Sequence, residues 1–143
     1  MLAAVEASAD IAGAAIGASD KPVTVLVEFA TWCPHCKEEL HELDALRAKH
    51  PNIRWLGVNY KAHEEYDNRG GAPQVAAFVA ATPWLRVVPT DEALYAALGK
   101  PKKIPTLWVF DAKHALVAKY DRENGHEMPS ATEIDALFTR LGG

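Results

Sequence analysis

The sequence has little of three things: cysteine, uninterrupted apolar sequence and excess positive charge. Of its 143 residues only Cys33 and Cys36 are cysteines, and one close pair excludes a scaffold held together by several disulfides. There is no apolar run of about eighteen residues, which excludes a predicted membrane-spanning helix. The net charge is −4 and the sequence pI is near 5.8, which argues against a broad surface for nucleic-acid phosphates.

What the sequence does have is enough apolar material for one ordinary domain. Hydrophobic residues make up 49% of the chain, which is sufficient for a buried core and excludes general disorder. No internal repeat, low-complexity tract or linker divides the chain. We therefore expect a single domain over residues 1–143, and we expect it to be a monomer.

Residues 1–20 are rich in alanine but lack the features of a secretion signal. No Lys or Arg precedes Lys21, and Glu6 and Asp10 interrupt the apolar character. The segment predicts an amphipathic first helix that ends near Gly17. The positions expected to be partly buried are Leu2, Val5 and Ile16. No signal or anchor is therefore expected within this chain.

Strand and helix patterns alternate along the rest of the chain. The β-branched run Val23–Phe29 predicts a central strand buried on both faces, and Pro34 is well placed to open a helix that stops by Pro51. The remaining expected elements are a strand at 53–60, a loop at 61–71, a helix from Pro73 to Thr82, a short strand at 84–88, a helix capped by Thr90 and closed by Gly99, a hairpin of strands 106–110 and 115–120, and a last helix after Ser130 with a capping box to Glu133. This order predicts an α/β fold with a mixed sheet and helices on both faces.

The string TWCPHC at 31–36 carries the chemistry. Cys33 and Cys36 are one helical turn apart, so both sulfurs can face the same side. Cys33 lies at the expected N-terminus of the helix, where free N–H groups and the macrodipole lower the pKa of a thiol. Cys36 lies one turn inward. We expect Cys33 to attack or be attacked by a partner sulfur, and Cys36 to resolve the mixed disulfide.

The cysteine pair is compatible with two other uses. The pair could form half of a zinc or copper site completed by His35, His41 or His63, but four ligands are normal for zinc and the chain has no other cysteine. A purely structural disulfide across so short a loop would stabilise the fold little. Redox exchange is the favoured interpretation, and no metal is expected.

At two separate places the sequence resembles the thioredoxin-fold superfamily. VTVLVEFATWCPHCKEEL at 23–40 resembles its active-site strand, turn and helix, and KKIPTLWVFDAKHALVAKY at 102–120, with WLGVNY before it, resembles the TlpA/ResA-like branch. The resemblance covers roughly residues 21–141. It implies a three-layer α/β/α sandwich with a helical insertion between Asn59 and Ile104. It also implies that Pro105 is cis beside the CxxC, where the backbone of Ile104 could pair with a substrate peptide.

The resemblance further implies a function. It predicts a thiol-disulfide oxidoreductase of the TlpA-like reductase type, acting on protein thiols or disulfides together with a redox partner protein. It implies no cofactor beyond the redox-active disulfide Cys33–Cys36, and a periplasmic or other extracytoplasmic location. The alternative to an enzyme is a thioredoxin-fold interaction module whose cysteines have no role in its function.

The sequence departs from the family between the cysteines and after the cis-proline, and the first departure leaves the direction of electron flow open. Pro34 and His35 stand between the cysteines, as in the oxidising DsbA proteins, and a histidine there can stabilise the thiolate and make the disulfide a better oxidant. A DsbA-like oxidase or isomerase is therefore the alternative to a reductase. Thr106 stands where cytochrome-c-maturation members usually have glutamate.

Glu28 is a second candidate site residue. Family members often keep a buried acid on this strand as the proton acceptor of the resolving cysteine, and burial in the apolar run would raise the pKa of Glu28. Glu28 is one residue closer to the CxxC than the thioredoxin acid, and a shift of one residue turns a strand side chain to the other face. A proton-relay role and a partnered or surface position are both open.

The remaining aromatic and basic residues carry weaker expectations. Trp32, next to the nucleophile, is expected to shield it or to form part of a docking surface. The other tryptophans, Trp55, Trp84 and Trp108, are expected to pack in or near the core. The lysines before the predicted cis-proline, Lys100, Lys102 and Lys103, indicate a solvated turn, or a cluster that supports a thiolate. No role is assigned to His50, His114 or His126.

Overall fold

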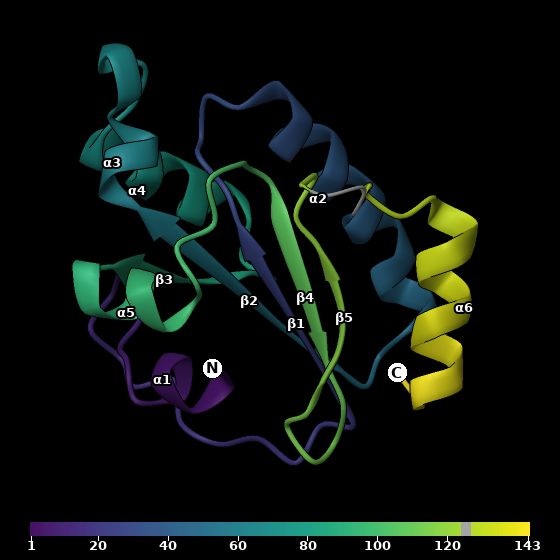
Figure 1. Cartoon of the computed structure of the whole chain (residues 1–143). Helices are drawn as coiled ribbons and strands as arrows, with labels where there is room; N and C mark the ends of the chain where they lie inside the picture. The colour runs from purple at the N-terminus through teal and green to yellow at the C-terminus, as the bar shows by residue number, and fades with distance from the viewer. Residues whose placement is uncertain (124–126) are drawn as a thin grey trace.

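The computed structural model describes residues 1–123 and 127–143, so His126 lies outside the described residues. Five strands form one mixed sheet in the order β3-β2-β1-β4-β5 (Figure 1). The strands are β1 (Val23–Glu28), β2 (Ile53–Tyr60), β3 (Arg86–Thr90), β4 (Thr106–Phe110) and β5 (Leu116–Tyr120). The first three run parallel to one another, and β4 is antiparallel to both β1 and β5. The predicted mixed sheet is confirmed.

The central strand β1 positions the site. All six of its residues are buried, as the β-branched run predicts. Its pairing register with β4 places Glu28 opposite Thr106, the residue that follows Pro105. The last residue of the central strand and the predicted cis-proline therefore lie at the same end of the sheet.

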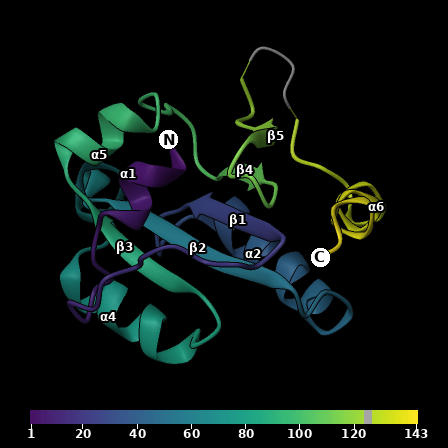
Figure 2. The same ribbon diagram turned by 90° about the horizontal axis from the view of Figure 1, so that it is seen from below.

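Helices cover both faces of the sheet (Figure 2). They are α1 (Leu2–Glu6), α2 (Pro34–Leu46), α3 (Lys61–Glu64), α4 (Ala72–Ala81), α5 (Glu92–Ala97) and α6 (Ala131–Leu141). One core packs side chains of α2, α4 and α6 against the sheet, and a second core on the other face packs those of α1 and α5. The predicted three-layer sandwich is confirmed, with α3, α4 and α5 in the predicted insertion. No helix within 1–123 or 127–143 is long and apolar enough to cross a membrane.

The N-terminal prediction of a helix up to Gly17 is wrong. Helix α1 ends at Glu6, and the carboxylate of Asp10 accepts hydrogen bonds from the backbone N–H groups of Ala12 and Ala14, which fold the chain into a turn. The Ile11 N–H then donates to the Val87 carbonyl at the edge strand β3. The alanine-rich segment therefore leaves the helix to cover an exposed sheet edge.

Two predicted boundaries also need correction. The stretch 61–71, expected to be a loop, contains α3 and the 3₁₀ turn Tyr66–Asn68. The N-cap of α5 is Asp91, whose side chain accepts from the Leu94 N–H, because Thr90 is still paired in β3. The last helix begins as predicted, with the Ser130 hydroxyl accepting from the Glu133 N–H.

Candidate redox site

Cys33 is the N-cap of α2. Its backbone is extended and Pro34 occupies the first helical position, where the missing N–H costs nothing. The Sγ atom takes the place of a capping oxygen and accepts the Cys36 N–H at 3.2 Å. Both thiols are free; Cys33 is 3% exposed and Cys36 is fully buried. The helix therefore presents one sulfur at its tip and keeps the other beneath it.

The two thiols are electrostatically unequal. The hydrogen bond from the Cys36 side chain, with smaller contributions from backbone N–H groups and the charge of His35, lowers the pKa of Cys33 to about 6. Burial, and then the bond to Cys33, raise the pKa of Cys36. His35 is exposed, with Nδ1 3.8 Å from the carboxylate of Glu38. At neutral pH Cys33 is a thiolate and Cys36 a thiol.

The peptide bond between Ile104 and Pro105 is cis, as predicted. The Ile104 carbonyl oxygen lies 4.0 Å from the Cys33 sulfur, although the two residues are 71 positions apart in the sequence. Arg122 Nη1 donates to the same oxygen at 3.0 Å, a contact that the sequence did not predict. The Ile104 carbonyl therefore lies between a thiol and a guanidinium.

Glu28 is buried at the end of β1, which excludes the surface alternative. Its Oε1 is 2.8 Å from Nδ1 of His63, while Oε2 has no hydrogen-bond partner among the described residues. Burial raises the pKa of Glu28, and the bond to His63 acts against that rise. The negative charge of Glu28 is one of the causes that raise the pKa of Cys36.

The loop before Cys33 is fixed by the short helix α3. The Trp32 indole donates to the carbonyl oxygens of His63 and Glu64, at 3.1 and 2.9 Å. The buried Glu64 carboxylate accepts the Thr31 N–H at 2.8 Å, the Thr31 hydroxyl, and the Asn59 side-chain amide at 2.9 Å. Glu64 was missed because charged residues before two glycines indicated a solvated loop.

Comparison with solved structures shows the same arrangement of elements elsewhere. A thioredoxin-like protein from Aeropyrum pernix matches with a TM-score of 0.76 and 18% identity, over 97% of this chain and 91% of the other. A secreted Mycobacterium tuberculosis disulfide oxidoreductase homologous to E. coli DsbE gives 0.69 and 18%, over 93% of each chain. StoA from Bacillus subtilis gives 0.66 and 20%, over 92% of this chain and 93% of the other. The fold is that of the thioredoxin-like proteins. No protein-family model matches the sequence, and no curated protein matches it.

Among the described residues, the three histidines considered as metal ligands do not form a ligand set with the cysteines. His63 is paired with Glu28 and His35 with Glu38, while His41 lies exposed on α2. In the described part of the chain no group of three or more His, Cys, Asp or Glu side chains could hold a metal ion. The metal-handling alternative therefore lacks a ligand set there.

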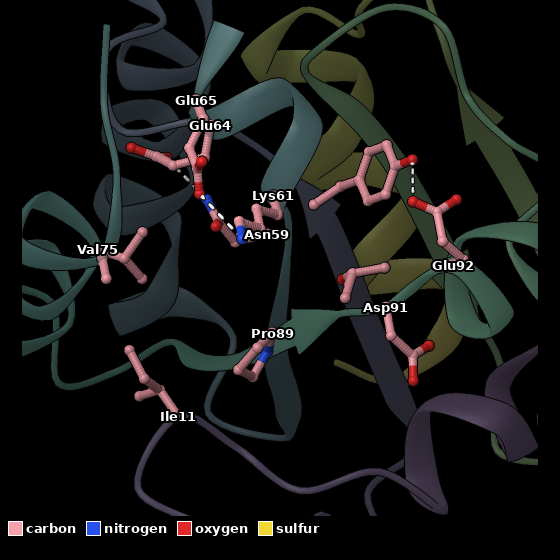
Figure 3. A pocket seen from close by; sticks show the side chains of 12 residues that line it. Ile11, Asn59, Lys61, Glu64, Glu65, Val75, Pro89, Asp91 and Glu92 are labelled. Atoms are coloured by element: carbon pink, nitrogen blue, oxygen red, sulfur yellow. Dashed lines mark hydrogen bonds and ion pairs between the residues drawn. The ribbon is translucent and has the colours of Figure 1, made fainter. Parts of the chain in front are cut away.

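A cavity of about 700 Å³ lies beside α3, between the ends of β2 and β3 (Figure 3). Its lining includes the apolar residues Ile11, Val75 and Pro89, and it also includes charged residues of α3 and α5, namely Lys61, Glu64 and Glu92. Glu64, which lines it, is the residue that binds Thr31. The loop before Cys33 and this cavity thus share one buried carboxylate.

The remaining tryptophans, two further histidines and the three lysines before Pro105 lie in the core or at the surface of the thioredoxin-like fold. Trp55 and Trp84 pack edge to face at 5.6 Å, and Trp108 is fully buried, which confirms their predicted packing. His50 bonds to Asp135 and His114 approaches Glu6. Lys100, Lys102 and Lys103 are exposed, and Lys103 Nζ donates to the Arg122 carbonyl.

Proposed function

We propose that the chain is a thiol-disulfide oxidoreductase that exchanges disulfides with protein substrates through Cys33 and Cys36. One observation carries the proposal: the Cys33 sulfur caps α2 over a buried Cys36 thiol and faces the Ile104 carbonyl beside a cis-proline. The low pKa of Cys33 supports a nucleophilic role, because the thiolate is the reactive form. Some proteins with similar folds are themselves described as disulfide oxidoreductases or thiol:disulfide interchange proteins.

In the reducing direction the Cys33 thiolate attacks one sulfur of a substrate disulfide. The substrate S–S bond breaks, its electron pair leaves with the second substrate sulfur, and Cys33 is joined to the first in a mixed disulfide. Cys36 then loses its proton and attacks the Cys33 sulfur. This forms the Cys33–Cys36 bond and releases the first substrate sulfur as a thiolate. The substrate gains two electrons and the protein loses two.

The neighbouring residues have supporting roles in this proposal. The backbone of Ile104 and the ring of Pro105 form the surface against which an extended substrate lies, and Trp32 shields the nucleophile. Pro34 sets the start of α2, and His35 adds positive charge near the thiolate when it is protonated. Glu28, bonded to His63, acts on Cys36 through its negative charge, which is one of the causes that raise the pKa of Cys36.

We propose the reducing direction on the strength of the TlpA-like resemblance. A second candidate, a DsbA-like oxidase or isomerase, is supported by the pKa of about 6 at Cys33, since a stabilised thiolate favours the dithiol form. Equilibration with glutathione buffers separates the two. A reduction potential of about −270 mV is expected for a thioredoxin-like reductase, and one of about −120 mV would assign the protein to the DsbA-like class.

We further propose an extracytoplasmic location, periplasmic in a bacterium with two membranes, a separate redox partner protein, and a monomeric state with no cofactor beyond the cysteine pair. A secreted protein from Mycobacterium tuberculosis and an exposed lipoprotein from Streptococcus pneumoniae have similar folds, which supports the location. Fractionation of the source cells tests the location, and light scattering tests the monomeric state.

The proposed activity is tested with oxidised insulin and a dithiol reductant. The parent protein should accelerate insulin reduction, and Cys33→Ser should abolish the acceleration. His41→Asn, on the exposed side of α2, is the matched control and should retain it. Equal rates for the parent and Cys33→Ser would contradict the proposal.

A further inference from the structure

Side-chain hydrogen bonds to backbone carbonyls tie the segment before Pro105 to the turn after β5. Arg122 Nη1 donates to the Ile104 carbonyl at 3.0 Å, and Lys103 Nζ donates to the Arg122 carbonyl at 3.1 Å. The Thr106 hydroxyl donates to the Lys103 carbonyl at 2.8 Å, which closes the same segment on itself. The backbone on both sides of Pro105 is therefore fixed, in part by a residue 18 positions further along the chain than Ile104.

Arg122 has a backbone conformation that few residues other than glycine adopt. Its φ is 60°, in the left-handed region, and the Asp121 carboxylate accepts the Glu123 N–H at 2.9 Å across it. Residues held in this region by their surroundings concentrate at functional sites. In this turn the conformation goes together with a guanidinium that reaches back to the segment before Pro105.

The Arg122 guanidinium is not used for an ion pair. Four other arginines each lie within ion-pair distance of a carboxylate: Arg47, Arg54, Arg69 and Arg86. Arg122 lines a groove of about 210 Å³ together with three glutamates of α2, yet among the described residues it is paired with no carboxylate. Its side chain donates to a backbone carbonyl instead, which indicates that the orientation of this carbonyl matters.

The carbonyl that Arg122 holds is the one beside the nucleophile. Its oxygen lies 4.0 Å from the Cys33 sulfur, so the sulfur and the guanidinium both approach one oxygen atom. A carbonyl oxygen has two lone pairs, and the bond to Arg122 leaves one of them for a second donor. An extended peptide binds an exposed backbone segment through N–H groups of its own. The Ile104 carbonyl is thus held where such a peptide would pair next to Cys33.

We propose that Arg122 is a positioning residue for polypeptide substrates: it holds the Ile104 carbonyl so that a substrate N–H donates to it while the substrate disulfide lies at Cys33. The inference rests on the proposed function, because it concerns the same nucleophile. It adds a residue from the turn after β5, which carries no sequence motif. The substrate that benefits is an extended chain with a backbone N–H near its disulfide, and a disulfide without peptide groups gains nothing.

Two disulfides of different chemistry separate docking from reactivity. The peptide probe consists of two short uncharged peptides joined by a disulfide, one carrying a fluorophore and the other a quencher. The small probe is hydroxyethyl disulfide, which has neither an N–H group nor a charge. Each is mixed in excess with the reduced protein at pH 8, where Cys33, with a pKa of about 6, is ionised. Fluorescence follows the peptide reaction, and the loss of protein thiols after an acid quench follows the small probe.

Arg122→Asn is the decisive variant. Asparagine tolerates the left-handed backbone, but its side chain is too short to reach the Ile104 carbonyl. We expect the half-saturating peptide concentration to rise about tenfold, the size expected for one hydrogen bond to a charged group, while the limiting rate changes less than about twofold. The rate with hydroxyethyl disulfide should be unchanged. Arg140→Ala removes an exposed arginine from α6 as the matched control, and it should behave as the parent with both probes.

The outcomes distinguish this inference from the proposed function. An unchanged or lower half-saturating concentration in Arg122→Asn overturns the inference, and a lower one identifies Arg122 as a cover that substrates displace. An equal loss with both probes also overturns it, because Arg122 would then act on the Cys33 sulfur and not on docking. In all these cases the parent still reduces both disulfides.

Failure of the parent to reduce either probe overturns the proposed function instead. If Arg122→Asn does not fold by circular dichroism, the same measurements on Arg122→Gly decide, because glycine also suits the left-handed backbone and has no side-chain donor.

Discussion

Replacing Cys36 by alanine should make Cys33 a weaker acid. In the parent, the pKa of Cys33 is lowered to about 6, with the Cys36 side-chain hydrogen bond as the largest cause. At pH 7 about 90% of Cys33 is then thiolate, against about 3% for an ordinary cysteine with a pKa of about 8.5. A hydrogen bond to a charged group contributes about 1.5–3 kcal/mol, which corresponds to about one to two pKa units.

The alanine variant keeps the Cys36 backbone N–H, which donates to the Cys33 sulfur at 3.2 Å. We therefore expect a midpoint of about 7 to 8, still below the ordinary value. Cys36→Ser retains a hydroxyl donor and should stay close to the parent. The assay is thiolate absorbance at 240 nm, or the iodoacetamide reaction rate, measured from pH 4 to pH 9. Equal midpoints for the alanine and serine variants, or a parent midpoint near 8.5, would refute the reasoning.

Three further predictions concern buried carboxylates and a glycine. Burial raises the pKa of Glu39 to about 7, so the folded protein binds this proton more tightly than the unfolded chain does. The resulting contribution to the free energy of unfolding is fully present below about pH 4.3 and is lost as the pH rises through 7. Glu39→Gln should raise the urea-measured free energy of unfolding by about 1–3 kcal/mol at pH 8 and change little at pH 4. Glu64→Ala leaves the Thr31 N–H without its carboxylate partner, so it should lower the free energy of unfolding by about 2–4 kcal/mol and slow the alkylation of Cys33. An unchanged urea midpoint would contradict the role of Glu64 in fixing the loop before Cys33. Gly70→Ala should act in the same direction, since a Cβ there would meet Glu64 Oε2 at 2.0 Å, whereas Gly71→Ala, with no contact under 3.6 Å, is the control and should be mild.

The parts of the site that could be predicted are those with short-range signals. A β-branched run before a turn predicts a buried strand, and a proline after Cys33 predicts a helix start, so the placement of both cysteines followed from neighbouring residues. The cis Ile104–Pro105 bond came from the family resemblance, because its place beside the cysteines depends on a contact across 71 positions.

The missed parts depend on tertiary contacts. The charges of residues 61–71 indicate solvent exposure, yet Glu64 is buried because the Thr31 backbone and the Asn59 amide provide its hydrogen bonds. The partner of Glu28 was hidden for the same reason, since α3 must fold back before His63 reaches the end of β1. The prediction for residues 1–20 was wrong for a different reason. Alanine favours helix, but the chain instead forms the turn at Asp10 and a hydrogen bond to the edge strand β3.

The central claim, that Cys33 attacks and Cys36 resolves, is tested most directly by trapping the mixed disulfide. Cys36→Ser and Cys33→Ser are each incubated with an oxidised substrate such as insulin, quenched with acid and weighed by mass spectrometry. The account predicts a covalent adduct on Cys33 in Cys36→Ser, little or none in Cys33→Ser, and reversal of the adduct by a dithiol. Adducts of equal yield in both variants, or an adduct only in Cys33→Ser, would contradict it.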